Sequence, residues 1–208
     1  MLFRSIIYAS AFGDLATVKL LVEKGASLAQ RDGYGKGSLH EAAFSGHTRL
    51  IEYFIYLGMD VNEPDTNGWT PVFLAAYNNK KDAIDLLIKN GGNVNFIAHL
   101  NHESPLYRAA QSNYTECTIA LLDGGADPYA ANWCGRTFLH GAALNGNMDV
   151  LEYAAEKNIK LDPPSNDGLT PLSMAIIFND NAGKNNKSID YLKKRTSVIH
   201  QAEIIDIK

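Results

Sequence analysis

One short pattern recurs at a nearly constant interval along most of the chain, and this interval limits the possible folds more than any other feature. A Ser or Thr opens four of the copies, usually with Pro next and a large apolar residue after it, and Gly37-Ser38-Leu39 is an earlier, degraded copy. Counted from Ser38 through Pro71, Pro105, Phe138 and Pro171, the spacings are 33, 34, 33 and 33 residues. A fixed period in this range predicts a solenoid, in which each unit buries its apolar face only against its neighbours.

The unit that begins at Asp65 shows what each copy predicts. Residues 65–68 have the turn composition Asp-Thr-Asn-Gly, and Thr70 and Pro71 then suit the cap and first residue of a helix. Asn79 ends this helix, since Asn adopts the left-handed conformation at low cost. A second helix with an i, i+3, i+4 apolar stripe follows and stops at Gly91; the stripe is Ile84, Leu87 and Ile88.

Other units repeat this plan at aligned positions. The predicted left-handed breaks between the two helices are Gly13, Gly46, Asn79, Asn113, Gly146 and Asn179. The predicted stops after the second helix are Gly25, Gly58, Gly91, Gly125 and Asn158. One face of each second helix should be buried between layers, which includes Ile51, Ile84, Leu151 and Ile189.

These motifs resemble the ankyrin repeat. The shared features are the Asp-x-x-Gly turn, the Thr-Pro-Leu-His helix start, the paired alanines, the Gly break and the Gly-x-Asp-Val-Asn exit, which stands here at residues 58–62. The resemblance covers roughly residues 5–195 and implies an all-α solenoid of stacked helix-turn-helix repeats with short β-hairpin-like fingers. It also implies a non-enzymatic protein–protein interaction module that binds through its concave face and finger tips.

The repeat divides one domain, residues 1–208, into six units. Residues 1–31 lack a finger and form an N-terminal capping repeat, and repeats follow at 32–64, 65–98, 99–131 and 132–164. The last unit, 165–208, carries a predicted loop insert near 181–187, a second helix from Ser188 and a capping helix in the tail from Ser197. The fourth unit has His99-Leu100-Asn101-His102 in place of Asp-x-x-Gly, so we expect its finger to have an irregular tip.

The resemblance also implies which residues bind the partner. At the finger tips they are Tyr34, Lys36, Asn67, Trp69, Glu103, Trp133, Arg136, Asp167 and Leu169. On the first helices, one or two places before each break, they are Phe44, Tyr77, Asn78, Gln111, Leu144, Asn145, Ile177 and Phe178. Aromatic residues of this kind dominate interface hot spots, so we favour a binding surface; the alternative is that Trp69 or Tyr77 packs between repeats.

Two groups of polar residues could form chemical sites, but neither is expected to be one. His40 and His140 follow the helix-start pattern, and in the family that histidine bonds backbone of the neighbouring repeat. His99, His102 and Glu103 could approach Cys134, but their spacing matches no standard zinc signature, so we expect neither a metal nor another cofactor.

Composition excludes several classes of partner. The formal net charge of −4 gives no general attraction to nucleic acid or anionic membranes, and no apolar run is long enough to span a bilayer. The start of the chain does not read as a signal peptide, and two cysteines make no disulfide framework. We therefore expect a cytoplasmic protein that is monomeric alone and binds neither nucleic acid nor membrane. Cys117 should be buried and Cys134 exposed.

Alternative functions stay open at this point. The chain could be a small inhibitory or neutralising (immunity-type) ankyrin protein, or a regulatory ankyrin segment of a larger enzyme or channel. An enzyme or metal protein is a third class, but the sequence gives no argument that places a nucleophile beside a base. Asn62 and Asn95 stand where asparaginyl hydroxylases modify ankyrin repeats, so the chain could also be an enzyme's substrate.

Overall fold

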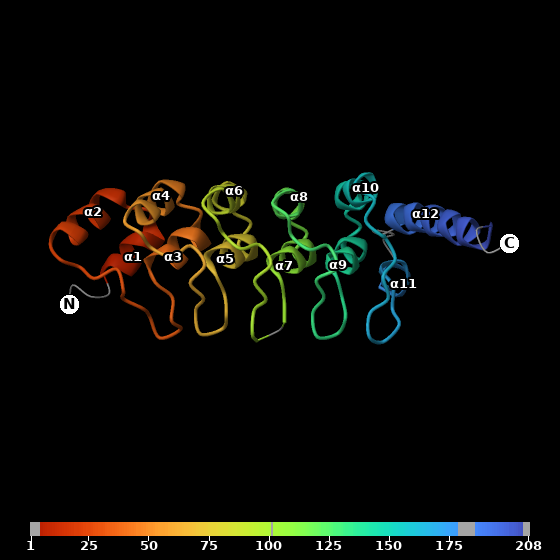
Figure 1. Cartoon of the computed structure of the whole chain (residues 1–208), viewed down its shortest axis with the longest axis horizontal. Coiled ribbons are helices and arrows are strands. Elements are labelled where there is room, and N and C mark those ends of the chain that lie inside the picture. The colour runs from red at the N-terminus through yellow and green to blue at the C-terminus, as the bar shows by residue number, and fades with distance from the viewer. Residues whose placement is uncertain (1–4, 101, 179–185, 206–208) are drawn as a thin grey trace.

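The structure, a computed structural model, describes residues 5–100, 102–178 and 186–205, and in these ranges it describes all side chains except those of residue 5 and residues 197–205. The described residues form helices joined by turns and loops, without a β-strand. Figure 1 shows the helices in two rows, with loops that project as fingers beside one row. The predicted all-α solenoid is confirmed, and its fingers are hairpin-shaped loops.

The inner row, next to the fingers, holds the first helix of each unit. It comprises α1 (Ser5–Phe12), α3 (Ser38–Ser45), α5 (Pro71–Tyr77), α7 (Pro105–Gln111), α9 (Phe138–Asn145) and α11 (Pro171–Ile177). The outer row comprises α2 (Leu15–Glu23), α4 (Thr48–Tyr56), α6 (Lys81–Lys89), α8 (Thr115–Asp123) and α10 (Met148–Glu156). Successive inner helices pack on one another from α1 to α11, and outer helices pack from α4 to α10.

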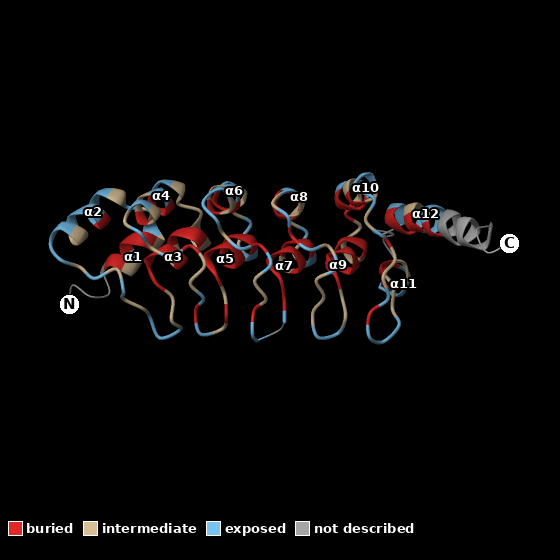
Figure 2. Ribbon diagram, in the orientation of Figure 1, coloured by how far each residue is buried: buried red, intermediate tan, exposed pale blue. Residues whose placement is uncertain are grey.

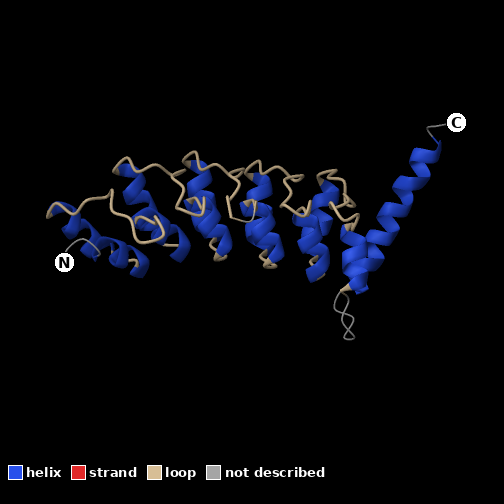
Figure 3. Ribbon diagram, turned by 90° about the horizontal axis from the view of Figure 1, so that it is seen from below, coloured by secondary structure: helices blue, strands red, loops and turns tan. Residues whose placement is uncertain are grey.

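The C-terminal end differs from the prediction. A single helix, α12 (Asn186–Ile205), begins two residues before Ser188, inside the predicted insert, and continues through the place where a separate capping helix was expected. The rest of the insert lies outside the described residues. This helix packs on α10 and α11 and leaves the stack at an angle (Figure 3). It carries no break residue after Leu192, so the two predicted helices form one.

Helix starts follow the predicted capping chemistry, in two versions. In α5, the Thr70 hydroxyl accepts a hydrogen bond from Phe73 N at 3.3 Å, and Ser104 caps α7 in the same way. In α3 and α9 the bond runs the other way, from the backbone of the cap residue to a histidine ring in the helix: Nδ1 of His40 accepts from Gly37 N, and Nδ1 of His140 accepts from Thr137 N.

Left-handed residues separate the two helices of each unit. Gly13, Gly46 and Gly146 have positive φ, as do Asn79 and Asn113. The predicted stops after the outer helices, Gly25, Gly58, Gly91, Gly125 and Asn158, share this conformation. Positive φ favours Gly and Asn over other residues, which explains why only these two occur there. The sixth predicted break, Asn179, lies outside the described residues.

A continuous core runs between the layers (Figure 2). Ile51, Ile84 and Leu151 have no exposed surface and Ile189 is 7% exposed, so the predicted burial of these four residues is confirmed. Burying side chains of this size contributes about 1.5–3 kcal/mol each. The paired alanines, among them Ala75 and Ala76, are fully buried where inner helices meet, and their small side chains let these helices lie close together.

Backbone hydrogen bonds join neighbouring fingers at their tips. Thr66 N donates to Tyr34 O, His99 N donates to Asn67 O and Asn166 N donates to Cys134 O, all at 2.9–3.0 Å. In the finger of the fourth unit, His102 adopts φ 54°, the left-handed conformation that Gly takes in the other tips. Its ring lies 6.4 Å from that of Trp133, so this irregular finger meets the next one through side chains.

Candidate functional site

Four aromatic rings form a cluster where the second finger meets the inner helices α3 and α5; we call Phe44, Trp69, Phe73 and Tyr77 the aromatic cluster. Trp69 stacks on Phe73 and on Tyr77, with centroids 5.5 Å apart in both pairs. Phe44 stacks on Tyr77 across the repeat boundary at 6.4 Å. The cluster therefore joins α3, α5 and the finger that precedes α5.

Two cations flank this cluster. Lys36 Nζ lies 5.5 Å from the Phe44 ring centroid and 6.0 Å from that of Trp69. On the other side, Arg108 Cζ lies 5.3 Å from the ring centroid of Tyr77. Positive charge over the face of an aromatic ring is attracted by its quadrupole, so these contacts hold the rings and the charges in fixed positions.

The cluster combines inter-repeat packing with exposed surface. Phe73 is buried, Trp69 and Phe44 are half-buried, and Tyr77 is 38% exposed. Trp69 does contribute to packing, since it is held against Phe73 and Tyr77, but it keeps an accessible edge. Phe73 thus lies at the packed end of the cluster and Tyr77 at the exposed end, and partner binding by these aromatics stays a prediction.

Several other predicted residues lie at accessible finger tips. Tyr34 is 66% exposed and Trp133 is 65% exposed. Asp167 is also exposed and lies 3.7 Å from half-buried Arg136 in the preceding finger, measured between Oδ2 and Nη2. Asn67 and Leu169 are half-buried, and their backbone carbonyls accept hydrogen bonds from His99 N and His140 Nε2.

Glu103 is not an exposed tip residue, and its predicted placement is wrong. Its side chain is buried and pairs with Arg108 five residues later, on α7. The same Arg108 donates from Nη1 to Gln111 Oε1 at 3.3 Å. Glu103 thus holds the guanidinium that covers Tyr77, and Gln111 is exposed beside it.

The two predicted asparagines of the inner helices make inter-repeat hydrogen bonds. Asn78 Nδ2 donates to Phe44 O at 2.7 Å, and Asn145 Nδ2 donates to Gln111 O at 2.9 Å. These amides bind the backbone of the preceding inner helix, so they act mainly in stacking. Of the other predicted residues on the inner helices, Leu144 is half-buried. Ile177 is 58% exposed and Phe178 is 55% exposed.

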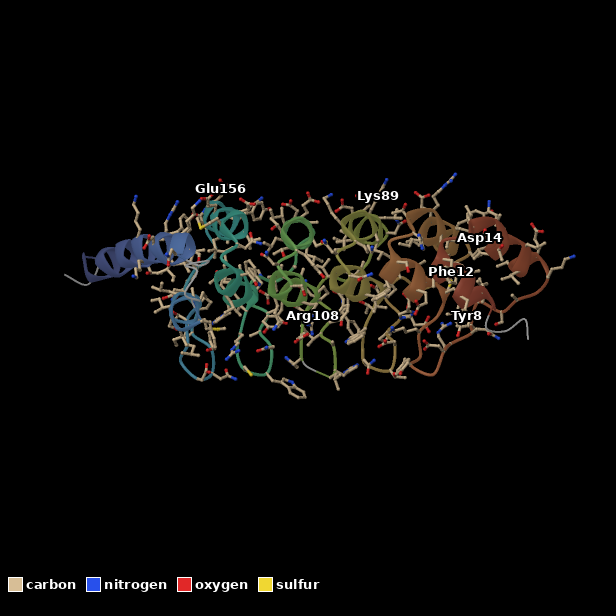
Figure 4. The ribbon with its side chains drawn as sticks, turned by 180° about the vertical axis from the view of Figure 1, so that it is seen from behind. Tyr8, Phe12, Asp14, Lys89, Arg108 and Glu156 are labelled. Carbon is tan, nitrogen blue, oxygen red and sulfur yellow. The ribbon has the colours of Figure 1, made fainter. Side chains whose placement is uncertain are left out.

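The structure adds three surface residues that the sequence analysis missed: Tyr8, Glu41 and Arg108. Each stands five places before the break of its unit, at Gly13, Gly46 or Asn113. These positions share a face with those one and two places before the break, because a helix returns to the same face after three or four residues. Figure 4 shows Tyr8 and Arg108 on the finger side, while Lys89 and Glu156 lie on the outer row.

Comparison with known proteins identifies the repeat. The family model described as ankyrin repeats in three copies matches residues 39–132 and 106–201, and the model for ankyrin repeats in many copies matches residues 6–55. The chain belongs to the ankyrin repeat family. Ankyrin repeats generally serve as protein–protein interaction modules.

Relatives carry ankyrin repeats in proteins of different kinds. Human ankyrin repeat and SOCS box protein 3 is 34% identical over 173 residues, which cover 66% of this chain and 33% of that protein. Putative ankyrin repeat protein FPV031 of fowlpox virus is 30% identical over 138 residues, with 63% and 40% covered. Putative palmitoyltransferase ZDHHC13 of Danio rerio is 33% identical over 130 residues, with 62% and 20% covered. The chain thus spans a fifth to two fifths of these relatives.

Both ankyrin histidines bond a backbone carbonyl near a repeat boundary. Glu63 ends the repeat that contains His40, whereas Leu169 belongs to the repeat after that of His140, so the predicted bond across repeats is made by His140. His40 Nε2 donates to Glu63 O at 2.9 Å, and His140 Nε2 donates to Leu169 O at 3.0 Å. Because Nδ1 accepts from a backbone N–H, each ring must be neutral to make both bonds. Burial accordingly lowers the pKa of His40 and of His140 below the ordinary value. This chemistry is structural.

The cysteines and the suggested metal ligands were also placed. Cys117 is buried, and burial raises the pKa of its thiol to about 11, whereas Cys134 is exposed; both are free, as expected. Within the described ranges, no three His, Cys, Asp or Glu side chains gather as a metal site would require. In the same ranges, no helix has the length and apolar character needed to cross a bilayer.

Asn62 and Asn95 tie successive ankyrin repeats together. Asn62 Nδ2 donates to Gly91 O at 2.9 Å, and its Oδ1 accepts from Asn93 N at 2.6 Å. Asn95 repeats this pattern one unit later, with Gly125 O and Asp127 N. Their amides are thus structural ties, and enzymatic modification of either residue stays a prediction.

Proposed function

We propose that this ankyrin domain is a non-enzymatic module that binds a partner protein across its inner helices and finger tips, with the aromatic cluster as its centre. The observation that carries the proposal is the exposure of Tyr77 within that cluster. Tyr77 stacks on Phe44 and Trp69 and still has 38% of its surface open to a partner. Large aromatic side chains of this kind are the residues that most often dominate interface energetics.

The surrounding contacts favour binding because the surface is already ordered. Stacking on Trp69 and the guanidinium of Arg108 hold the Tyr77 ring on two sides. A side chain fixed before binding loses little conformational entropy when a partner covers it. Exposed Trp133 and Ile177 extend the surface toward later repeats, which suits a partner helix or extended segment with apolar anchors.

The domain could serve in more than one kind of protein. Because the chain spans only part of its relatives' length, it could act as a regulatory ankyrin segment of a larger enzyme or channel. A small inhibitory or neutralising ankyrin protein would use the same surface. The exposed free thiol of Cys134 supports a reducing compartment such as the cytoplasm.

The test measures stability and affinity for the same set of variants. Trp69→Ala, Tyr77→Ala and Trp133→Ala should each weaken binding to a partner isolated from native lysate, and a hot-spot residue typically costs about 2 kcal/mol or more. Calorimetry would give the affinity, and urea unfolding would give the stability. We expect Tyr77→Ala and Trp133→Ala to keep most of the stability, whereas Trp69→Ala also loses packing against Phe73.

Tyr56→Ala is the matched control, since Tyr56 is 84% exposed on outer helix α4. It removes the same kind of side chain from the opposite side of the stack. Loss of binding in Tyr56→Ala, with unchanged affinity in Tyr77→Ala and Trp133→Ala, would place the binding surface on the outer helices and refute the proposed one.

A further inference from the structure

A separate pocket lies at the N-terminal end of the stack, between α1, the first finger and α3. Its volume is about 390 Å³, at the lower end of the range for small-ligand sites. Tyr8 lines it from α1, Tyr34 from the finger and Glu41 from α3. Tyr8 is 58% exposed, and Figure 4 shows its side chain on the finger side of α1. Two aromatic rings and a carboxylate therefore border one pocket.

The balance of charge in the pocket is negative. Arg31 and Asp32 also line it, but the guanidinium of Arg31 forms a two-point ion pair with Glu63 and donates to Leu28 O and Gln30 O. Its charge and donors are thus already satisfied. Asp32 uses Oδ1 to accept from two backbone N–H groups of its own finger, which leaves its negative charge without a paired cation among the described residues.

Glu41 has the least compensated charge in this pocket. Its side chain is half-buried, and no described residue makes a hydrogen bond or ion pair with its carboxylate. Burial raises the pKa of Glu41, an effect that nearby Lys36 opposes and Asp32 reinforces. Lys36 compensates the carboxylate only in part, because its ammonium lies over the Phe44 and Trp69 rings and forms no ion pair with Glu41. A cation that enters the pocket would supply the missing charge.

The tyrosine rings select for the same kind of ligand. A Lys ammonium or Arg guanidinium gains energy over the face of an aromatic ring, and more when water is displaced. An anion would face both Asp32 and Glu41, and an apolar group would desolvate the Glu41 carboxylate without pairing it. Neither alternative satisfies the charges of the pocket.

We propose that this pocket receives a cationic side chain, lysine or arginine, from an extended segment of the partner protein. The proposal rests on the proposed function, since it assigns one residue class to the partner. The pocket lies on the same side of the stack as the aromatic cluster, with Tyr34 in the finger next to Lys36. It extends the binding surface to the first unit and gives the partner a positive charge there.

The test uses the full chain, labelled with ¹⁵N, and two capped pentapeptides. Both have Gly and Ser around a central residue, which is arginine in one and citrulline, its uncharged isostere, in the other. We expect the arginine peptide to cause saturable shifts of the Tyr34 and Glu41 amides and the citrulline peptide to bind about tenfold more weakly. Glu41→Gln should weaken the arginine peptide by a similar factor, and Tyr34→Ala by about threefold.

Glu52→Gln is the matched control, because Glu52 is exposed on α4, and its affinity for the arginine peptide should be unchanged. Equal binding of the two peptides, or unchanged arginine binding in Glu41→Gln, would overturn the pocket. Trp69→Ala separates this proposal from the proposed function. This variant should bind the arginine peptide with wild-type affinity even if it no longer binds the partner protein. If the arginine peptide does not bind the pocket, partner binding by the aromatic cluster is not affected by that result.

Discussion

At the scale of single residues, Glu41 links the proposed pocket to stability. Burial raises its pKa above the ordinary value of 4.5, so the folded state disfavours the charged form once the pH exceeds that value. Glu41→Gln should therefore be more stable than the wild type at pH 7 and unfold at a higher temperature. The gain in free energy of unfolding should be less than about 1 kcal/mol, because water screens a half-exposed charge.

This gain should disappear below pH 4.5, where Glu41 is protonated in both states. Thermal unfolding followed by circular dichroism at pH 7 and pH 3.5 measures the difference. A variant less stable than the wild type at pH 7 would show that the Glu41 carboxylate is already paired in the fold.

His40 and His140 predict a second pH dependence of opposite sign. Their pKa values are lowered in the folded state, so their contribution is fully present above the ordinary value of 6.5 and is lost as the pH falls below it. Urea unfolding between pH 7 and pH 5 should show declining stability, by at most about 1.4 kcal/mol per pH unit for each histidine. His140→Gln should reduce that slope. Ring-proton NMR titrations with midpoints above 6.5 would contradict this account.

The residue scale is also where prediction from sequence failed most clearly. Glu103 was expected at an exposed tip because its position aligns with tip residues of other fingers. The aligned position does not reveal that Arg108, five residues later, folds back onto it. A repeat predicts the backbone of each unit well, but side chains that differ between units form contacts that no period describes.

At the scale of elements, the start of α5 depends on one buried hydroxyl. Thr70 has no exposed surface and accepts the hydrogen bond from Phe73 N. Thr70→Ala should cost about 1 kcal/mol, as expected for the loss of a helix N-cap. Urea unfolding measures this cost. Ser45→Ala at the end of α3 is the control, and its stability should change little. An equal loss of stability in both variants would show that the Thr70 hydroxyl does not stabilise α5 as a cap.

Helix boundaries were predictable because they depend on local chemistry. Gly46 and Asn79 mark breaks that any chain with this backbone would need, since other residues rarely adopt positive φ. The continuous α12 was not predicted. Its course depends on packing against α10 and α11. The polar residues before Ser188 are typical of a loop, so the sequence does not reveal that the helix begins at Asn186.

At the scale of the whole molecule, each unit depends mainly on its neighbours, so loss of stability should remain local. Leu87 in α6 and Leu192 in α12 have no exposed surface, and truncation to Ala should cost about 2–5 kcal/mol in each case. Hydrogen exchange in Leu192→Ala should rise chiefly in α10 to α12, and in Leu87→Ala it should rise in the central units. Uniform loss of protection in both variants would indicate one fully cooperative unit.

The inner helices also give the stack a direction. One position, two places before each break, contributes a side chain to the same face of every unit after the first. In chain order these are Phe44, Tyr77, Gln111, Leu144 and Ile177. This series starts with aromatic rings, passes a polar amide and ends with aliphatic groups. It is not the same when reversed, so an extended partner that matches it in one orientation is mismatched in the other. If the row binds an extended partner as proposed, it should therefore select the direction in which the partner's chain runs as well as its sequence.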